Sequence, residues 1–444
     1  MADEDAEPLS ARNERSFAYR TVKDRIPVIL TRVIDSLHRR KQKFAEERGK
    51  ECCEELKNVV GSFSELRYRL MTNKPLLPLA QCEFTVQWNK IISSEKQMYD
   101  DEQDFTWFQL PWLQIECYFY RYLVAVLQAS KSFREFDIFQ QQKQEVFYSA
   151  LSKINDIMQI HDRYLTDNIP TAALAASLRK QLSRYIKISL WANRFDLSIS
   201  GGEQIHVNHN TVGAVDSLDS NILVNDCDHL LNFLVKMHDS SLCTPVTVDI
   251  ILDNAGIELF GDLVLADFLL EYGFASKVRM HAKAIPWFVS DVTVQDFNWT
   301  LDQLCNSRNT ASQVFGNRLM KRQLNNHLQI IDDDFWTTWF DYSQMSERAP
   351  DLYRLLSQSS LVIFKGDLNY RKLVGDRNWP HHTTFKRALR GFRPSLLVAL
   401  RTLKADVLVG ISETILAEKF NLKAAPNSIN EWMVTGEYAV IQMH

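Results

Sequence analysis

The stretch that decides the fold is VTVDIILDNAG, residues 246–256. It begins as a short β-branched run and ends at Asp253-Asn254-Ala255-Gly256. Helical spacing follows at once, at Leu259, Leu263, Ala266, Leu269 and Leu270. A buried strand that leads directly into an amphipathic helix is the repeating unit of parallel sheets. The stretch therefore predicts an α/β domain.

Three further segments resemble this strand. Lys277–Ala282 precedes a turn at 285–287, Leu361–Phe364 stops at Lys365-Gly366-Asp367, and Leu396–Leu400 stops at Arg401. Strands that alternate with helices predict a three-layer α/β/α fold with a largely parallel sheet. Such sheets bind their ligands at the carboxyl ends of the strands, so functional residues are expected there.

The first part of the chain has a different pattern. Helical spacing begins near Val22 and recurs at 86–100, 112–129, 144–158 and 170–190, with little strand signal. We expect a disordered leader at 1–16, a mostly helical region at 17–200, a linker or loop at 201–220, and a catalytic α/β/α domain at 221–444.

Composition excludes several classes of protein. The 444 residues carry 51 Lys and Arg against 55 Asp and Glu, a net charge of -4, which argues against a nucleic-acid partner held by broad phosphate neutralisation. No apolar run approaches the roughly 18 residues that span a bilayer, and the polar N-terminus has no signal-peptide pattern. The seven cysteines include no CxxC pair. We expect an intracellular protein, cytoplasmic or nuclear, without a membrane or nucleic-acid partner.

The common nucleotide and hydrolase signatures are missing. The chain contains no GxGxxG, GxxxxGK[ST], GxSxG or HExxH motif. Standard dinucleotide, P-loop, α/β-hydrolase and zincin sites are therefore not expected.

Oxygen ligands follow two consecutive strands. Asp253 and Asn254 end the first strand, and Asp291 follows the next strand and turn. Carboxylate and amide oxygens suit Mg²⁺ or Mn²⁺. Each acid taken singly is also explained by helix capping. Two such acids at neighbouring strand ends favour a shared metal.

The other two strand ends are basic. Gly366 would let the backbone turn tightly and expose N–H groups to an anion, and Arg371 could add a forked phosphate contact. Lys404, just past the fourth strand, could hold a phosphate beside a metal. The competing explanation for the segment from Gly366 to Arg371 is a polar turn with solvated charges. The competing explanation for Lys404 is an exposed lysine at the end of a strand.

The near-neutral net charge of the chain conceals an acidic segment and a basic segment. Residues 360–404 hold ten Lys and Arg against two acids, whereas residues 248–296 hold eight acids against three cations. The pattern favours a small anion held against a metal, although much of the basic stretch could be solvated surface.

Several segments carry a family resemblance. LDNAG at 252–256, WFVSDVT at 287–293, FKGDLNYRKL at 364–373 and RTLKAD at 401–406 resemble the damage-control phosphatase family. The match is closest to its subfamily III, which is marked by an RTxK motif. SLWANRFDLS at 189–198 and VKDRIP at 22–27 also fit, so the resemblance covers nearly the whole chain.

The resemblance implies roles for particular residues. The divalent metal (Mn²⁺, Ni²⁺, Co²⁺ or Mg²⁺) would be bound by Asp253, Asn254 and Asp291. The catalytic residues would be Asp253, Asp291 and Lys404. Substrate contacts would come from Asp253, Asn254, Asp367, Leu368, Asn369, Tyr370, Arg371 and Lys404. Asn193, Asp196 and Arg401 could line the site, although a structural loop explains Asn193 and Asp196 equally well.

The resemblance also implies a reaction: hydrolysis of small phosphorylated metabolites such as fructose 1-phosphate and fructose 6-phosphate. The nucleophile stays open between a water activated by the metal and Asp253 itself. The family also carries a methyltransferase assignment, in which S-adenosylmethionine would methylate glutamate carboxyl groups of a protein substrate. The sequence has no Gly-rich loop after its first strand to favour that alternative. A non-enzymatic scaffold is a third and weaker alternative.

Overall fold

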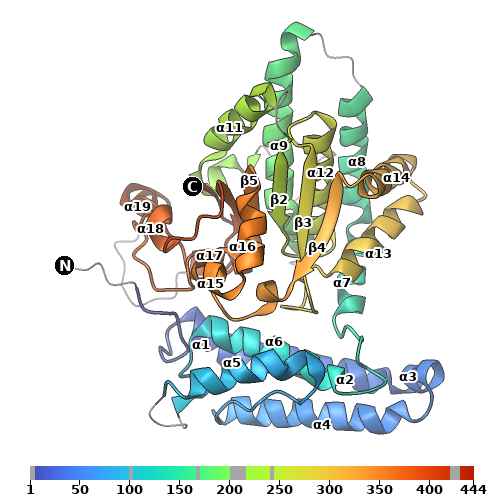
Figure 1. The fold of residues 1–444 in the computed structure, drawn as a ribbon, viewed down its shortest axis with the longest axis vertical. Coiled ribbons are helices and arrows are strands. Elements are labelled where there is room, and N and C mark those ends of the chain that lie inside the picture. Colours follow the sequence, from blue (N-terminus) through green and yellow to red (C-terminus); the bar gives the residue numbers. More distant parts are fainter. Residues whose placement is uncertain (1–5, 100–103, 167–170, 201–216, 241–244, 421–430) are drawn as a thin grey trace.

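The computed structural model describes residues 6–99, 104–166, 171–200, 217–240, 245–420 and 431–444. A mostly parallel sheet is covered by helices on both faces, and a layer of N-terminal helices lies across one end of it (Figure 1). The three-layer α/β/α fold with a helical N-terminal region is thus confirmed. Among the described helices, none combines the length and apolar character needed to cross a membrane.

The sheet has the strand order β1-β7-β6-β5-β2-β3-β4. The strands are β1 (Ile222–Asn225), β2 (Thr247–Ile251), β3 (Lys277–Lys283), β4 (Leu328–Asp333), β5 (Leu361–Lys365), β6 (Leu397–Thr402) and β7 (Ala439–Met443). Neighbours pair in parallel except β6 and β7, which are antiparallel. The carboxyl ends of β2 to β6 therefore lie at one edge. The four strands predicted from the sequence are β2, β3, β5 and β6.

Alternate residues of each strand face the two helical layers. Ile250 and Ile363, which are paired in register, lie in one hydrophobic core, and the next pair, Ile251 and Phe364, lies in the other. This alternation follows from the two-residue period of a strand. Because both faces are covered, both sets of side chains are apolar.

One face of the sheet is covered by long helices. They are α8 (Leu151–Thr166), α9 (Thr171–Ser200), α11 (Cys227–Ser240), α12 (Ile257–Glu271), α13 (Val294–Cys305) and α14 (Thr310–Leu324). Helix α12 is buried from 257 to 269 and packs closely on α9, where a Cβ at Gly261 would lie 3.0 Å from Ala192. Helices α8 and α9 thus share a core with the sheet, although the sequence places them with the N-terminal helical region.

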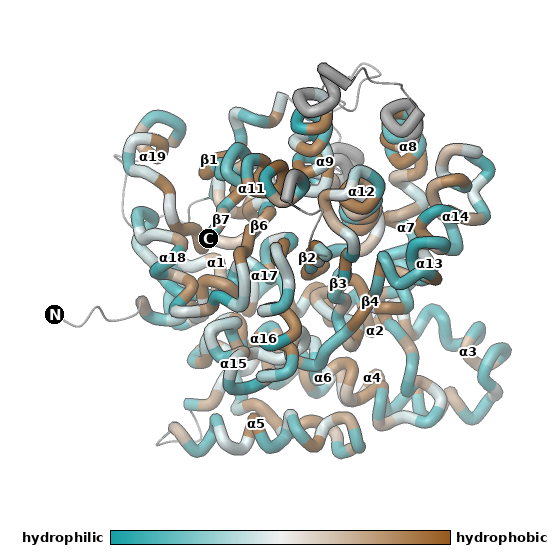
Figure 2. Tube along the Cα trace, turned by 45° about the horizontal axis from the view of Figure 1, so that its top comes forward, coloured by the Kyte–Doolittle hydropathy of each residue, from teal (hydrophilic) through white to brown (hydrophobic). Residues whose placement is uncertain are grey.

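The other core includes the short helices that follow β4. They are α15 (Met345–Arg348), α16 (Pro350–Ser357), α17 (Gly366–Leu373), α18 (Phe385–Ala388) and α19 (Glu413–Phe420). Figure 2 shows apolar residues along the strands and polar residues along outer helices such as α3.

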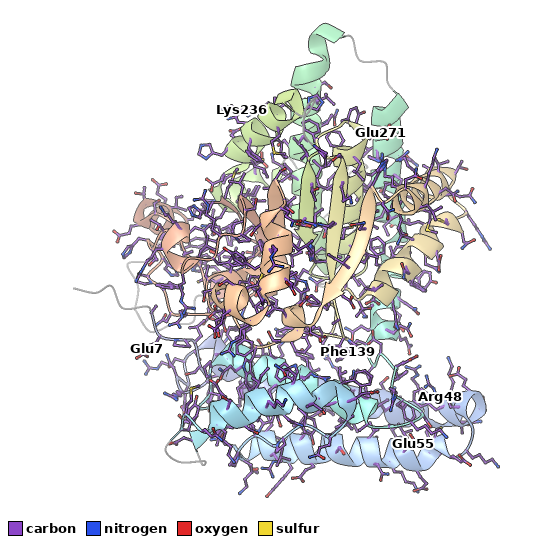
Figure 3. All side chains as sticks on the ribbon, in the orientation of Figure 1. Glu7, Arg48, Glu55, Phe139, Lys236 and Glu271 are labelled. Atoms are coloured by element: carbon purple, nitrogen blue, oxygen red, sulfur yellow. The ribbon has the colours of Figure 1, made fainter. Side chains whose placement is uncertain are left out.

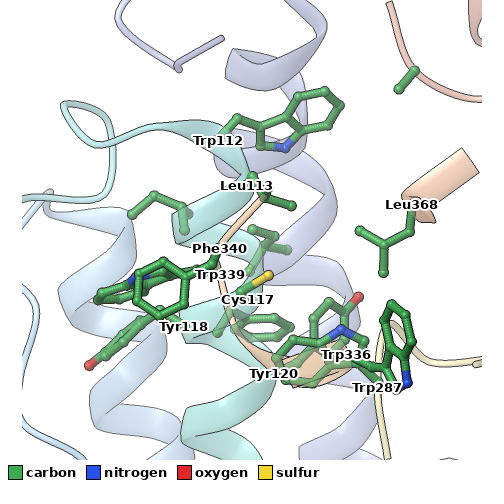
Figure 4. Packing of buried hydrophobic residues seen from close by; sticks show 14 of the residues in the cluster. Trp112, Leu113, Cys117, Tyr118, Tyr120, Trp287, Trp336, Trp339, Phe340 and Leu368 are labelled. Carbon is green, nitrogen blue, oxygen red and sulfur yellow. The ribbon is translucent and has the colours of Figure 1, made fainter. Parts of the chain in front are cut away.

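The N-terminal layer lies against the carboxyl edge of the sheet. Its elements are α1 (Phe17–Arg20), the π-helix η1 (Thr21–Arg25), α2 (Ile26–Arg39), α3 (Lys41–Arg48), α4 (Cys52–Met71), α5 (Val86–Lys96) and α6 (Trp112–Gln128). Helix α7 (Gln140–Ser149) leads from this layer to α8, and its Phe147 lies in the core of the long helices. The aromatic helix α6 is buried from 112 to 127. Its Tyr120 lies beside Trp287, which follows β3, with ring centroids 6.1 Å apart (Figure 4). The carboxyl edge of the sheet therefore rests on α6.

Residues 6–16 differ from the disordered leader expected there. Leu9 N donates to the carbonyl of Asp376 at 2.8 Å, and its own carbonyl accepts from Trp112 N at 2.7 Å. Ala11 is buried in the core. The segment is polar and lacks periodicity, so its order comes from tertiary backbone bonds that a local pattern does not reveal. Residues 1–5, and residues 201–216 of the expected linker, lie outside the described residues.

Candidate active site

The two acids expected at neighbouring strand ends lie side by side. Asp253 follows β2, and a backbone bridge joins Asn254 to Asp291. Val292 N donates to the carbonyl of Asp253 at 2.8 Å, and Ala255 N donates to that of Ser290 at 2.7 Å. Asp253 and Asp291 are both buried. Because β2 and β3 are adjacent and parallel, their following loops are close enough to be joined in this way.

The side-chain amide of Asn254 connects three groups. Its Nδ2 donates to Asp253 Oδ2 and to Glu258 Oε2, each at 2.8 Å, and its Oδ1 accepts from the hydroxyl of Ser290. Glu258 was not predicted as a site residue. Its signal is spacing: it lies four residues after Asn254, so the first turn of α12 brings it to the same face.

Burial and like charge make the acids hard to ionise. Burial, together with the charges of Glu258 and Asp291, raises the pKa of Asp253 well above its ordinary value against the opposing pull of Lys283 and Lys404. Burial likewise raises the pKa of Asp291 to about 6, although Lys283 opposes the shift. A bound cation would relieve both effects.

One carboxylate oxygen has no hydrogen-bond donor. Asp291 Oδ2 is buried and accepts no hydrogen bond from the described residues. The ammonium of Lys283 lies 3.4 Å away and donates instead to the carbonyl of Leu252 at 2.6 Å. A carboxylate oxygen held only by this long ion pair, beside a second carboxylate and an amide oxygen, forms a donor set that fits a hard divalent cation.

The protein alone would not complete the coordination of such an ion. No group of three or more His, Cys, Asp or Glu side chains in the described part of the chain is arranged to hold a metal. Mg²⁺ and similar ions are commonly held by one or two carboxylates, with water and substrate phosphate oxygens in the other positions. The donor set matches that arrangement.

The basic side of the site is organised around Asp367. Its Oδ1 accepts from Arg401 Nε at 2.8 Å and from the backbone N–H of Lys404 at 3.0 Å. Burial raises the pKa of Asp367, but Arg401, Arg371 and the Lys404 N–H outweigh it, so the net shift is downward. Arg401 also donates to the carbonyls of Ala405 and Val407. Arg401 therefore secures the loop that carries Lys404 and is not itself exposed to a ligand.

Gly366 brings the basic and acidic sides together. Its φ is +78°, and a Cβ built on it would lie 1.8 Å from Asp253 Oδ2. Only a residue without a side chain allows the start of α17 to approach the carboxylate this closely. The segment forms a helix and not the turn expected from the sequence, and its first turn carries backbone N–H groups that lack partners within the helix.

Four expected substrate contacts have their side chains elsewhere. Leu368 is buried in the core, and Asn369 Nδ2 donates to the carbonyls of residues 251, 252 and 365. The hydroxyl of Tyr370 donates to Gln442 at 2.7 Å. Arg371 bonds Glu116 at 2.6 Å and Asp376 at 2.8 Å, and its guanidinium lies 3.6 Å from the ring centroid of Trp112. Only the backbone of 368–371 is left for a ligand.

The basic stretch is accordingly less of an anion-binding surface than its composition suggests. Lys365 is fully buried, where it lies 2.9 Å from Asp262 and donates to the carbonyl of Ser189. Arg371 and Arg401 are equally engaged. Lys404, in contrast, is partly exposed and acts on the charge of Asp253. Some of the acids that pair these cations are distant in sequence, such as Asp262 for Lys365 and Glu116 for Arg371, so pattern alone could not separate structural from functional charges.

Two further expected residues lie on α9. Asn193 and Asp196 belong to the helix by their backbone, but their side chains lie outside the described residues.

Fold and site together define a class of protein: a parallel α/β/α sheet whose carboxyl edge sets buried carboxylates beside a lysine loop. The family described as "Damage-control phosphatase ARMT1-like domain" matches residues 21–419. The chain belongs to this family.

Several relatives match over almost their full length. The chain is 40% identical over 440 residues to "Damage-control phosphatase ARMT1" of Xenopus laevis, covering 98% of each chain. It is 41% identical to the protein of the same name from Danio rerio, over 98% of this chain and 96% of that one. The Homo sapiens protein of that name is 38% identical over 98% of this chain and 97% of its own.

Proposed function

We propose that the chain is a metal-dependent phosphatase that hydrolyses small phosphorylated metabolites, with hexose phosphates such as fructose 1-phosphate and fructose 6-phosphate as substrates. Family membership supports the phosphatase class. The observation that carries the proposal is the buried pair of Asp253 and Asp291, in which Asp291 Oδ2 accepts no short hydrogen bond from the described residues and has only the ammonium of Lys283 at 3.4 Å.

In this proposal Asp253, Asn254 and Asp291 hold a divalent ion, which could be Mn²⁺, Co²⁺, Ni²⁺ or Mg²⁺. The amide oxygen of Asn254 has a second lone pair beyond the one used by Ser290. When bound, the ion supplies charge neutralisation and polarisation at a phosphoryl oxygen. Glu258 orients the Asn254 amide through the bond to Nδ2.

The protein's own groups would bind the rest of the phosphate. The ammonium of Lys404 would balance negative charge that develops on the transferring group, and the first-turn N–H groups of α17 would donate hydrogen bonds to its oxygens. Asp367 holds the backbone of Lys404 in place, so the lysine is positioned before the substrate arrives. Most of the rate gain would then come from preorganised charge.

No specific observation favours methyl transfer. The loop after β2 holds Asp253 and Asn254 in the position of a Gly-rich loop, and Gly256, its one glycine, packs against Val146. Methyl transfer from S-adenosylmethionine to a protein substrate is therefore measured as an alternative activity in the experiment below. A scaffold role is the outcome if neither activity is found.

The test is a panel assay on purified protein. Phosphate release from fructose 1-phosphate, fructose 6-phosphate and other sugar phosphates is measured with each of the four metals and with a chelator. Metal-dependent release by the wild type, lost in Asp253→Asn, supports the proposal. No release with any metal, alongside transfer of labelled methyl groups from S-adenosylmethionine, would replace it with the methyltransferase. If neither phosphate release nor methyl transfer is observed, the scaffold role is favoured.

A further inference from the structure

A groove of about 710 Å³ lies between the N-terminal helices and the turn after β3. We propose that this groove binds a second anionic group of the substrate, a phosphate or a carboxylate, through Arg25 and Arg32. The inference rests on the proposed phosphatase function and deepens it, because it adds to the hexose monophosphates a class of substrates that carry a second, uncleaved anionic group. We call it the arginine groove; its walls come from α1, η1, α2, residues 138–142 and residues 288–290.

The arginine groove adjoins both sides of the site. On one wall is Ser290, whose hydroxyl bonds the amide oxygen of Asn254 at 2.5 Å. On another is Phe17, whose backbone N–H donates at 3.2 Å to Asp406, two residues beyond Lys404. The groove is thus connected through Ser290 to the acidic cluster and through Phe17 to Asp406, in the segment that follows Lys404.

The turn that forms one wall has an unusual backbone. Phe288 and Val289 have φ angles of 42° and 71°, values that are costly for non-glycine residues and most of all for a β-branched one. The ring of Tyr120 on α6 stacks on Phe288 at 4.7 Å, which holds the turn in this conformation. Backbone strain that is held by its surroundings is concentrated at ligand-binding sites.

The wall of the groove formed by η1 also has an irregular backbone. Residues 21–25 form a π-helix, a rare element that is frequently found at functional sites. It presents Thr21, Asp24 and Arg25 to the groove. Two uncommon backbone features therefore line the same groove.

The charge of the groove favours an anion. Three arginines line it against a single acid, Asp24. Arg20 pairs with Glu431 at 2.8 Å, and Arg25 acts on the charge of the buried Glu116, but no described residue forms a hydrogen bond or ion pair with the guanidinium of Arg25 or Arg32. Free guanidinium groups bind phosphate and carboxylate in forked geometry.

The remaining lining explains why the anion would belong to an extended molecule. Val28, Ile29 and Phe139 give the groove apolar surface, and Phe139 lies where the helical layer meets the sheet (Figure 3). A carbon skeleton packed on these side chains would link a cleavable phosphate at Lys404 to the second anion at the arginines. The cavity volume lies within the range of small-molecule sites.

The experiment measures binding without turnover, so that it is independent of the proposed activity. Metal-free protein is titrated calorimetrically with fructose 1-phosphate, fructose 1,6-bisphosphate and 6-phosphogluconate, for the wild type, the double variant Arg25→Gln/Arg32→Gln and the control Lys23→Gln. Lys23 is on η1 but outside the groove, with its ammonium 5.1 Å from the ring centroid of Tyr19. Unfolding temperatures verify that each variant is folded.

The wild type and Lys23→Gln should bind at least one doubly anionic ligand about tenfold or more tightly than the monophosphate, as expected for one charge-assisted contact. The double variant should lose that preference. Preference for the bisphosphate alone identifies a phosphate site, and preference for 6-phosphogluconate alone a carboxylate site. Equal wild-type affinities, or a preference that survives in the double variant, would overturn the inference even if phosphate release from monophosphates were observed.

Discussion

Asp367 and Arg401 form a buried ion pair, 2.8 Å between Oδ1 and Nη2, and the same carboxylate oxygen accepts the backbone N–H of Lys404. The first and last residues of the RTxK motif therefore have different tasks. Arg401 holds the loop in place, and Lys404 is left to meet the substrate. The two roles can be separated experimentally.

Replacing Arg401 by Met should destabilise the fold. The change leaves Asp367 buried without its partner, which typically costs about 3–5 kcal/mol. Urea unfolding followed by circular dichroism measures the loss. A free energy of unfolding equal to that of the wild type would show that the pair does not secure the loop.

Replacing Lys404 by Ala should lower the activity and leave the stability of the fold almost unchanged. We expect kcat/KM for fructose 1-phosphate to fall about a hundredfold or more, since a charge aimed at the transition state is lost. Stability should change by no more than about 0.5 kcal/mol, because the side chain is partly exposed. The matched control is Lys386→Ala, an exposed lysine of the same basic stretch. If both variants kept full activity, Lys404 would have no role in the reaction.

Gly366→Ala should displace Asp253. The new Cβ would overlap Oδ2, and a misplacement of about 1 Å in a site can lower the rate about a hundredfold. Gly391→Ala is the control, because Gly391 has a similar φ of +86° but nothing within 4 Å of an added Cβ. It shares the backbone strain without the overlap. Equal rates for the two alanine variants would mean that the close approach to Asp253 is unimportant.

Asp267 should link stability to acid pH. Burial raises its pKa, but His161, Arg318 and Arg322 outweigh this and lower the pKa to about 2 from 3.8. Because the folded pKa is lowered, the stabilisation is complete above 3.8 and is lost as the pH falls towards 2, a total of about 2 kcal/mol.

Urea unfolding of the wild type and Asp267→Asn across pH 7 to about 2.5 measures this contribution. The gap between the two should narrow as the pH falls below 3.8. Asp35→Asn removes an exposed carboxylate paired only with Arg39 and should show a much smaller gap. A gap for Asp267→Asn that stays constant throughout the acid range would contradict the linkage.

The strands that carry the site were predictable because each is buried on both faces, and β2, β3 and β5 are followed by helices. The strands that were not predicted lack one of these features. Strand β4 is half exposed along most of its length, as an edge strand is, and β1 has only four residues. Strand β7 is buried but antiparallel to β6, and no helix follows it.

Within the site, too, some residues could be predicted from the local sequence pattern and others could not. Asp253, Asn254 and Asp291 could be located from sequence because parallel strands bring their ends together. The side chain of Arg371 could not, because one of its two acidic partners, Glu116, is 255 positions away on α6, and the nearby Asp376 does not by itself show that the guanidinium is buried. The order of residues 6–16 also depends on distant contacts, with the carbonyl of Asp376 among them. Local pattern predicts where charges gather, but tertiary pairing decides which of them remain available.

The most direct test of the central claim is the rate of phosphate release from fructose 1-phosphate as a function of Mn²⁺ concentration, for the wild type and for Asp291→Asn. We predict a saturable dependence on Mn²⁺ for the wild type and no release in chelator. Asp291→Asn should need about a hundredfold more metal or lose activity altogether, because the open Oδ2 is removed. An Asp291→Asn curve that superimposes on that of the wild type, or a wild type that releases no phosphate at any Mn²⁺ concentration, would contradict the account.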